Sequence, residues 1–288
     1  MGYLYAIIVI FSILVICLFT FYSNNYIKLT KYDYDKNISN GFDGYKILHV
    51  SDLHGDFTTW KYNQLLRRTF ELEPDLVVVT GDCIDKIHIK NCEMVLSYLK
   101  EVNKRFQLFL VSGNHEFMHL ECKDFWERLE TEGFNILHNS HVDIVRGTDI
   151  IRLYGVDDPY ALYCDNMPSR YVTPREQFIS LLKQKMVIDS QQQYLSILLS
   201  HRPEFFDVYS RLGYHIIFTG HAHGGQWRLP FLGGVIAPDQ GMFPKYTAGK
   251  YSIEKSTMIV SRGLGNSVIP VRLFNNPELV LLTLHNKI

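Results

Sequence analysis

KILHVSDLH (residues 46–54) opens a pattern that recurs twice downstream, in LVVVTGDCID (76–85) and LFLVSGNHE (108–116). Each stretch is a short apolar run, rich in β-branched residues, followed at once by polar residues. Such runs are typical of buried strands. Amphipathic segments separate them, at Trp60–Glu71 and Glu93–Asn103, and these predict helices. Strands that alternate with helices in this way predict an α/β fold.

The second half of the chain repeats the pattern with more strand and less helix. YLSILLS (194–200) leads directly to His201, and HIIFT (215–219) leads to Gly220-His221-Ala222-His223. A β-rich stretch over 135–156 and two apolar runs after Ser256 add further strands. We therefore expect a second sheet packed against the first.

Polar residues follow each of these five strands, at the end where open α/β sheets place their sites. Taken alone, each polar group is weak evidence, because an Asp-x-His sequence after a strand is equally compatible with a turn. Together they supply imidazole and oxygen donors without thiolate, a mixture that suits Mn, Fe or Zn. Seven donors are too many for one ion and fit two ions that share a carboxylate. The seven are Asp52, His54, Asp82, Asn114, His201, His221 and His223.

The order and spacing of these motifs resemble the calcineurin-like metallophosphoesterases over residues 45–288. The resemblance implies an α/β fold built as a four-layer α/β/β/α sandwich of two mixed sheets. It also implies that Asp82 bridges two divalent metal ions. Asp52, His54 and His223 would complete the first ion, and Asn114, His201 and His221 the second.

The same resemblance implies a catalytic role for His115, which would not bind metal. It would act as general acid at the leaving-group oxygen, or stabilise charge on the phosphoryl group. A water between the two ions would be the nucleophile. Either Asp85 or Glu116 would orient a histidine ligand from behind; the sequence leaves the choice between them open.

A narrower likeness extends past these motifs. Residues 220–251 (GHAHGGQWRLPFLGGVIAPDQGMFPKYTAGKY) and 261–284 (SRGLGNSVIPVRLFNNPELVLLTL) resemble the bacterial membrane-associated, YkuE/YaeI-like branch of the family. Aromatic and apolar residues over 227–231 and 243–246 fit either the core or a lipid-facing rim.

The N-terminal segment 3–22 contains twenty residues without a charge, which suits a bilayer span. Tyr and Phe lie near its ends, as at membrane interfaces. A cleaved signal peptide would carry a positive charge before the run and small residues after it, and neither is present. A buried core helix is the other alternative. We expect an anchor over 1–24, a linker with an edge strand over 25–44, and a catalytic domain over 45–288.

The membrane face is less constrained than the span. Lys28, Lys31 and Lys36 follow the segment, so the positive-inside rule favours a cytoplasmic domain. Relatives of the branch that are exported leave the opposite face open. The net charge of −1 gives no electrostatic reason to expect nucleic acid, and no motif indicates an obligate protein partner.

These features predict a metal-dependent hydrolase of phosphomonoesters or phosphodiesters at the cell membrane. The resemblance and the anchor favour a lipid-linked substrate, such as a UDP-diacylglucosamine-like pyrophosphate or a phospholipid. The alternative is a catalytically silent membrane-bound scaffold on the same fold. Silent members normally lose metal ligands, whereas this chain carries all seven together with His115.

Overall fold

The computed structural model describes residues 2–162, 174–188, 194–266 and 271–287. Two six-stranded mixed sheets form the centre of the molecule. The first sheet runs in the order β1 (Lys28–Tyr34), β16 (Glu278–Leu284), β2 (Lys46–Val50), β3 (Leu76–Thr80), β4 (Gln107–Val111) and β5 (Asn135–Ile136). The second runs in the order β14 (Gly249–Ile253), β15 (Ser256–Val260), β9 (Ile216–Thr219), β8 (Leu195–Leu199), β7 (Asp149–Gly155) and β6 (Ser140–Arg146).

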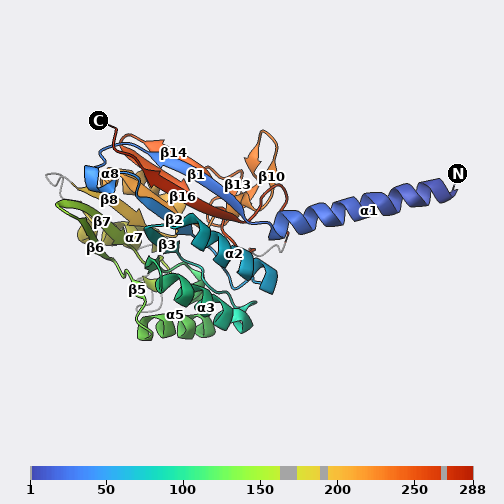
Figure 1. The fold of residues 1–288 in the computed structure, drawn as a ribbon, viewed down its shortest axis with the longest axis horizontal. Helices are drawn as coiled ribbons and strands as arrows, with labels where there is room; N and C mark the ends of the chain where they lie inside the picture. Colours follow the sequence, from blue (N-terminus) through green and yellow to red (C-terminus); the bar gives the residue numbers. More distant parts are fainter. Residues whose placement is uncertain (1, 163–173, 189–193, 267–270, 288) are drawn as a thin grey trace.

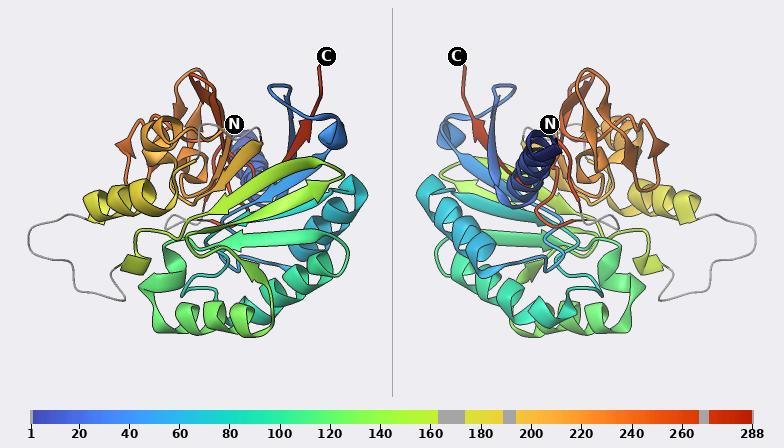
Figure 2. Two further views of the ribbon diagram at one scale, coloured as in Figure 1. Left: turned by 90° about the vertical axis from the view of Figure 1, so that its left-hand side faces the viewer. Right: turned by 90° about the vertical axis from the view of Figure 1, so that its right-hand side faces the viewer.

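Helices cover the outer face of each sheet, which makes four layers (Figures 1 and 2). Outside the first sheet lie α2 (Thr59–Leu72), α3 (Cys92–Asn103) and α5 (Leu120–Thr131). Outside the second lie α7 (Pro174–Lys185) and α8 (Phe206–Arg211). The predicted α/β/β/α sandwich is therefore confirmed.

Successive side chains along the central strands point to opposite faces of each sheet, and both faces are buried. In β3, Val77 and Val79 pack under the helices, while Val78 faces the other sheet. In β8, Ile197 faces the first sheet and Leu198 faces α7 and α8. Strands buried on both sides need near-continuous apolar runs, which is the pattern that made them visible in the sequence.

The five strands that precede the predicted donors, β2, β3, β4, β8 and β9, all end at one edge of the molecule, which we call the catalytic edge. The helix α1 (Gly2–Asn25) leaves from that edge. β1 follows α1 after two residues and runs parallel to β16. β16 is antiparallel to β2, and β2 is parallel to β3 and β4. The start of β1 therefore lies at the same edge of the sheet as the end of β2, with β16 between the two strands. Figure 1 shows α1 projecting from this edge.

The helix α1 is exposed along almost its whole length. Its Tyr3–Asn25 portion is long and apolar enough to cross a bilayer, with a mean hydropathy of 2.9, and none of its most apolar window is buried against the protein. This exposure excludes the buried core helix that the sequence left open. The end of the helix contacts the domain, since the Asn24 side chain accepts a hydrogen bond from the backbone N–H of Arg272 at 2.8 Å.

Two small hairpins stand beside the base of α1. They consist of β10 (Arg228–Leu229) with β11 (Gly233–Gly234), and β12 (Ile236–Ala237) with β13 (Gly241–Met242). Strands of two residues have no periodicity to read, so the sequence did not reveal them. Both hairpins follow the loop that carries His221 and His223, so they extend outward from the catalytic edge.

His49, in the middle of β2, is expected to make stability depend on pH. Its ring nitrogen Nε2 lies 2.8 Å from Thr80 Oγ1, and burial lowers the pKa of His49 to about 3. The folded protein keeps the ring neutral, while the unfolded chain takes up a proton below about pH 6.5. Stability is therefore present above pH 6.5 and falls as the pH drops, by about 1.5 kcal/mol between pH 6.5 and 5.

Urea denaturation of the wild type and His49→Gln between pH 5 and 7 isolates this contribution, because other titrating groups act equally in both. The variant is expected to lose less stability on acidification. Parallel curves for the two proteins would contradict the assignment.

Candidate metal centre

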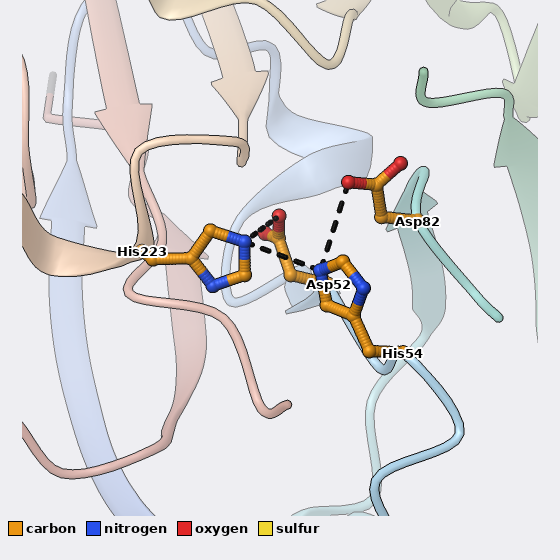
Figure 3. Close-up of side chains that lie close together, drawn as sticks. All are labelled: Asp52, His54, Asp82 and His223. Atoms are coloured by element: carbon orange, nitrogen blue, oxygen red, sulfur yellow. Dashed lines mark hydrogen bonds and ion pairs between the residues drawn. The ribbon is translucent and has the colours of Figure 1, made fainter. Parts of the chain in front are cut away.

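The seven predicted donors lie in the loops that follow β2, β3, β4, β8 and β9, and six of them, all but Asn114, come together in two groups of candidate ligands. Asp52, His54, Asp82 and His223 form one buried group, drawn in Figure 3. Asp82 forms a second group with His201 and His221. In each group the candidate ligand atoms lie within 4.8 Å of one another. Asp82 belongs to both groups, which is the position expected of a bridging carboxylate.

One oxygen of Asp82 faces both groups. Its Oδ2 lies 3.1 Å from His201 Nε2 and 3.6 Å from His54 Nε2. The other oxygen, Oδ1, accepts the backbone N–H of His115 at 2.9 Å. That hydrogen bond holds the carboxylate in the orientation that presents Oδ2 to both sides.

Imidazole nitrogens also face one another across each group. His54 Nε2 lies 3.2 Å from His223 Nε2, and His201 Nε2 lies 3.1 Å from His221 Nδ1. Lone pairs that converge in a buried space suit a cation better than they suit one another.

Asn114 adds a further donor. Its Oδ1 is buried and has no hydrogen-bond partner among the described residues, while its Nδ2 lies 3.2 Å from the sulfur of Met118. Buried polar atoms are normally paired, so this unpaired amide oxygen, one residue before the His115 backbone N–H that donates to Asp82, is compatible with a ligand position. The residues present therefore fit a divalent-metal centre.

The backbone of these loops is held in an uncommon conformation. Five of the seven donors have positive φ angles between 47° and 64°: Asp52, His54, Asp82, His221 and His223. A side chain in this region costs of order 1–3 kcal/mol and persists where the surroundings impose it, commonly at functional sites. Gly220 permits the close packing, because a Cβ there would lie 2.3 Å from Asp52 Oδ2.

Outer partners hold several of the histidine rings. Asp85 Oδ2 lies 3.3 Å from His54 Nδ1, and the Thr80 carbonyl lies 2.7 Å from His201 Nδ1. Of the two carboxylates that the sequence offered for this task, Asp85 is thus the one placed beside a histidine. Glu116 instead accepts backbone N–H groups from Asp82, Cys83 and Gly113, and so fixes the loops themselves.

Asp239 is a partner that the sequence did not reveal. Its Oδ2 lies 2.9 Å from His221 Nε2, which leaves Nδ1 of that ring facing His201. Arg202 also donates to Asp239, and its Nε donates to Asp158 at 2.5 Å. Asp239 lies eighteen residues beyond His221 in a loop without periodicity, so no motif spacing pointed to it.

Burial and the neighbouring histidines shift the pKa values of the buried carboxylates in opposite directions. Burial would raise the pKa of Asp82, but His201 and His115 hold it well below its ordinary value. Burial raises the pKa of Asp52 despite nearby His201. Two carboxylates this close and this buried need compensating positive charge, which divalent ions would supply.

His115 lies beside the two groups. Its ring packs edge-on against His54, with ring centroids 4.8 Å apart. Burial lowers the pKa of His115, while Asp82 partly opposes that shift. The ring therefore borders the first group of candidate ligands.

Comparison with known proteins agrees with this geometry. Residues 45–225 match the model of the family described as calcineurin-like phosphoesterase. An uncharacterised metallophosphoesterase, YkuE of Bacillus subtilis, is 30% identical and is matched over 86% of this chain and 81% of its own. The phosphodiesterase YaeI of Escherichia coli is 27% identical, over 83% of this chain and 82% of its own.

A third relative has a named lipid substrate. It is the UDP-2,3-diacylglucosamine pyrophosphatase LpxG of Chlamydia muridarum, which is 24% identical over 90% of this chain and 89% of its own. The family match covers most of the chain, including every strand that leads to the site. The chain therefore belongs to the calcineurin-like phosphoesterase family and is a hydrolase of the metallophosphoesterase type.

Proposed function

We propose that this protein hydrolyses phosphomonoesters or phosphodiesters with a pair of divalent metal ions. The observation that carries the proposal is the position of Asp82, one oxygen of which faces two separate groups of buried donors. Asp52, His54 and His223 would hold one ion, and Asn114, His201 and His221 the other. The donor set is compatible with Mn, Fe or Zn.

Two divalent ions, when bound, activate a water as nucleophile and neutralise charge on the phosphoryl oxygens. The chain's own residues orient the metal ligands and supply a proton donor or a charge-stabilising group. Asp85 and Asp239 hold the rings of His54 and His221, so that the opposite nitrogens point into the site. His115 donates a proton to the leaving-group oxygen or stabilises charge on the phosphoryl group.

We further propose that the substrate is lipid-linked and that α1 anchors the catalytic domain, 45–288, to the cell membrane. The exposed apolar helix supports the anchor. The lipid pyrophosphatase among the relatives supports the substrate class. A reporter fused to the C-terminus would show on which face of the membrane the catalytic domain lies, since it distinguishes a cytoplasmic domain from an exported one.

The direct test uses the full chain in detergent with Mn²⁺ and bis-p-nitrophenyl phosphate, together with elemental analysis of the purified protein. We expect hydrolysis that EDTA abolishes and Mn²⁺ restores. Absence of both activity and bound metal, with any divalent ion, would favour the silent scaffold instead. A panel of phospholipids and nucleotide–lipid pyrophosphates then identifies the substrate.

Asp239→Asn is expected to weaken metal binding at the second group. Loss of an outer carboxylate that orients a ligating histidine typically costs about 10- to 100-fold in metal affinity or activity. Titration of the metal-free protein with Mn²⁺, followed by activity, measures the shift. Asp207→Asn is the matched control, because the Asp207 side chain is half-exposed in the first turn of α8. An unchanged affinity would mean that His221 needs no support from Asp239.

A further inference from the structure

Six large apolar side chains are each more than half exposed around the base of α1. They are Trp60, Phe231, Leu232, Met242, Phe243 and Phe274, and we call them the apolar rim. The side chain of Phe231, at the turn of the β10–β11 hairpin, is fully exposed. A cluster of this kind on a soluble surface is costly, and it commonly marks an interaction site.

Two members of the apolar rim contact α1 directly. The ring of Phe274 packs on Phe19, with centroids 5.1 Å apart, and the ring of Trp60 lies 6.5 Å from that of Phe21. Phe19 and Phe21 belong to the last turns of the apolar helix. Whatever surrounds this end of α1 must therefore also surround Phe274 and Trp60.

Hydrogen bonds connect the hairpins to the same region. Trp227 Nε1 donates to the carbonyl of Val271 at 3.0 Å, and the backbone N–H of Arg228 donates to the carbonyl of Leu273 at 2.9 Å. The backbone N–H of Phe243 donates to the carbonyl of Val235 at 2.8 Å. Figures 1 and 2 show the hairpins beside the base of α1.

The length of α1 places this region at the surface of a bilayer. The 23 residues of Tyr3–Asn25 rise about 1.5 Å each, or about 35 Å in all, against a hydrocarbon core about 30 Å thick. Asn24 and Asn25 are then at the polar boundary, and the residues that contact Phe19 and Phe21 lie just within it.

We propose that the apolar rim is a membrane-docking surface that inserts into the bilayer in which α1 resides. This proposal rests on the anchoring proposed above. The rim adjoins the metal centre, because β10 begins three residues after Gly225, and Asn275, next to Phe274, donates to the carbonyl of His223 at 2.7 Å. Attachment by both helix and rim presents the catalytic edge to the lipid surface.

Fluorescence of single introduced tryptophans in the full chain tests the proposal. The background is Trp60→Phe with Trp227→Phe, which keeps only the buried Trp126. Into it we introduce Phe231→Trp in the rim, Ile10→Trp in α1, or Val145→Trp. Val145 is an exposed residue of β6 that pairs with Ile150 at the start of β7, on the opposite edge of the sheet.

Each variant is reconstituted in phosphatidylcholine and phosphatidylglycerol vesicles, with and without lipids brominated at carbons 6 and 7. A side chain that penetrates the acyl boundary meets these bromines. We expect the fluorescence of the indole introduced at position 231 to fall by roughly half, as at an interfacial depth. The indole introduced at position 10 lies inside the hydrocarbon core, and its fluorescence should also fall. The signals from the indole at position 145 and from Trp126 should stay unchanged.

The other outcomes separate the rim from the anchor. Quenching at position 10 without quenching at position 231 overturns docking and leaves the anchor intact. Absence of quenching at both positions overturns the anchor and the rim together. Equal quenching at positions 145 and 231 indicates adsorption without orientation, and also overturns the proposal. Melting curves of the variants confirm that each is folded.

Discussion

Asp82→Asn is expected to empty the metal centre and to remove hydrolysis at the same time. The substitution replaces Oδ2, which faces both donor groups, with an uncharged amide whose N–H groups would point into both donor groups. Removal of an outer partner already costs about 10- to 100-fold, so a shared ligand should cost more than about 100-fold in metal affinity. Elemental analysis after dialysis and the rate with bis-p-nitrophenyl phosphate measure the two losses.

Asn at this position can still accept the backbone N–H of His115 through its own oxygen, so the loop should keep its shape. Asp124→Asn, on an exposed face of α5, is the matched control. A variant that keeps two ions per chain and loses only turnover would show that Asp82 is not shared between them.

His115→Ala is expected to keep both ions and to lower kcat by roughly 10²- to 10⁴-fold, the range for loss of a positioned acid or base. The ring lies against His54 but belongs to neither group of candidate ligands. His119→Ala, four residues further on, serves as control. Loss of metal from His115→Ala would place this ring among the ligands.

The leaving group distinguishes the two roles open to His115. p-Nitrophenolate departs without protonation, whereas an alkoxide needs a proton. If His115 is a general acid, the defect should be much larger for an alkyl phosphodiester than for the nitrophenyl ester. If it stabilises charge on the phosphoryl oxygens, the two defects should be similar.

The strands, and the clustering of six of the seven predicted donors, could be predicted from the sequence because the end of a buried strand coincides with the first polar residue. A strand buried on both faces must be apolar throughout, as in Leu76–Thr80, so the first polar residue after it marks the edge of the sheet. Parallel strands bring those edges together. The same logic cannot find Asp239, which reaches His221 only because its own loop adopts a left-handed turn there.

The choice between Asp85 and Glu116 also depended on loop geometry. Both carboxylates follow a candidate ligand closely, but only a side-chain direction decides which reaches an imidazole and which reaches backbone N–H groups. The sequence could not decide between a core and a lipid-facing rim for a different reason. Aromatic residues in a loop look alike whether they fill a core or face a lipid, until the exit point of α1 is known.

The pairing of β1 with β16 has a consequence for biogenesis. Lys28, at the start of β1 shortly after α1, pairs with Glu278 at the start of β16, 250 residues later in the chain. Among the described strands β1 pairs only with β16, so during synthesis β1 has no strand partner until β16 has been made. Contacts this distant in sequence form slowly, and an unpaired edge is prone to wrong partners. Chains shortened at the C-terminus so that β16 is missing should therefore fail to complete the first sheet and be degraded faster than the full chain.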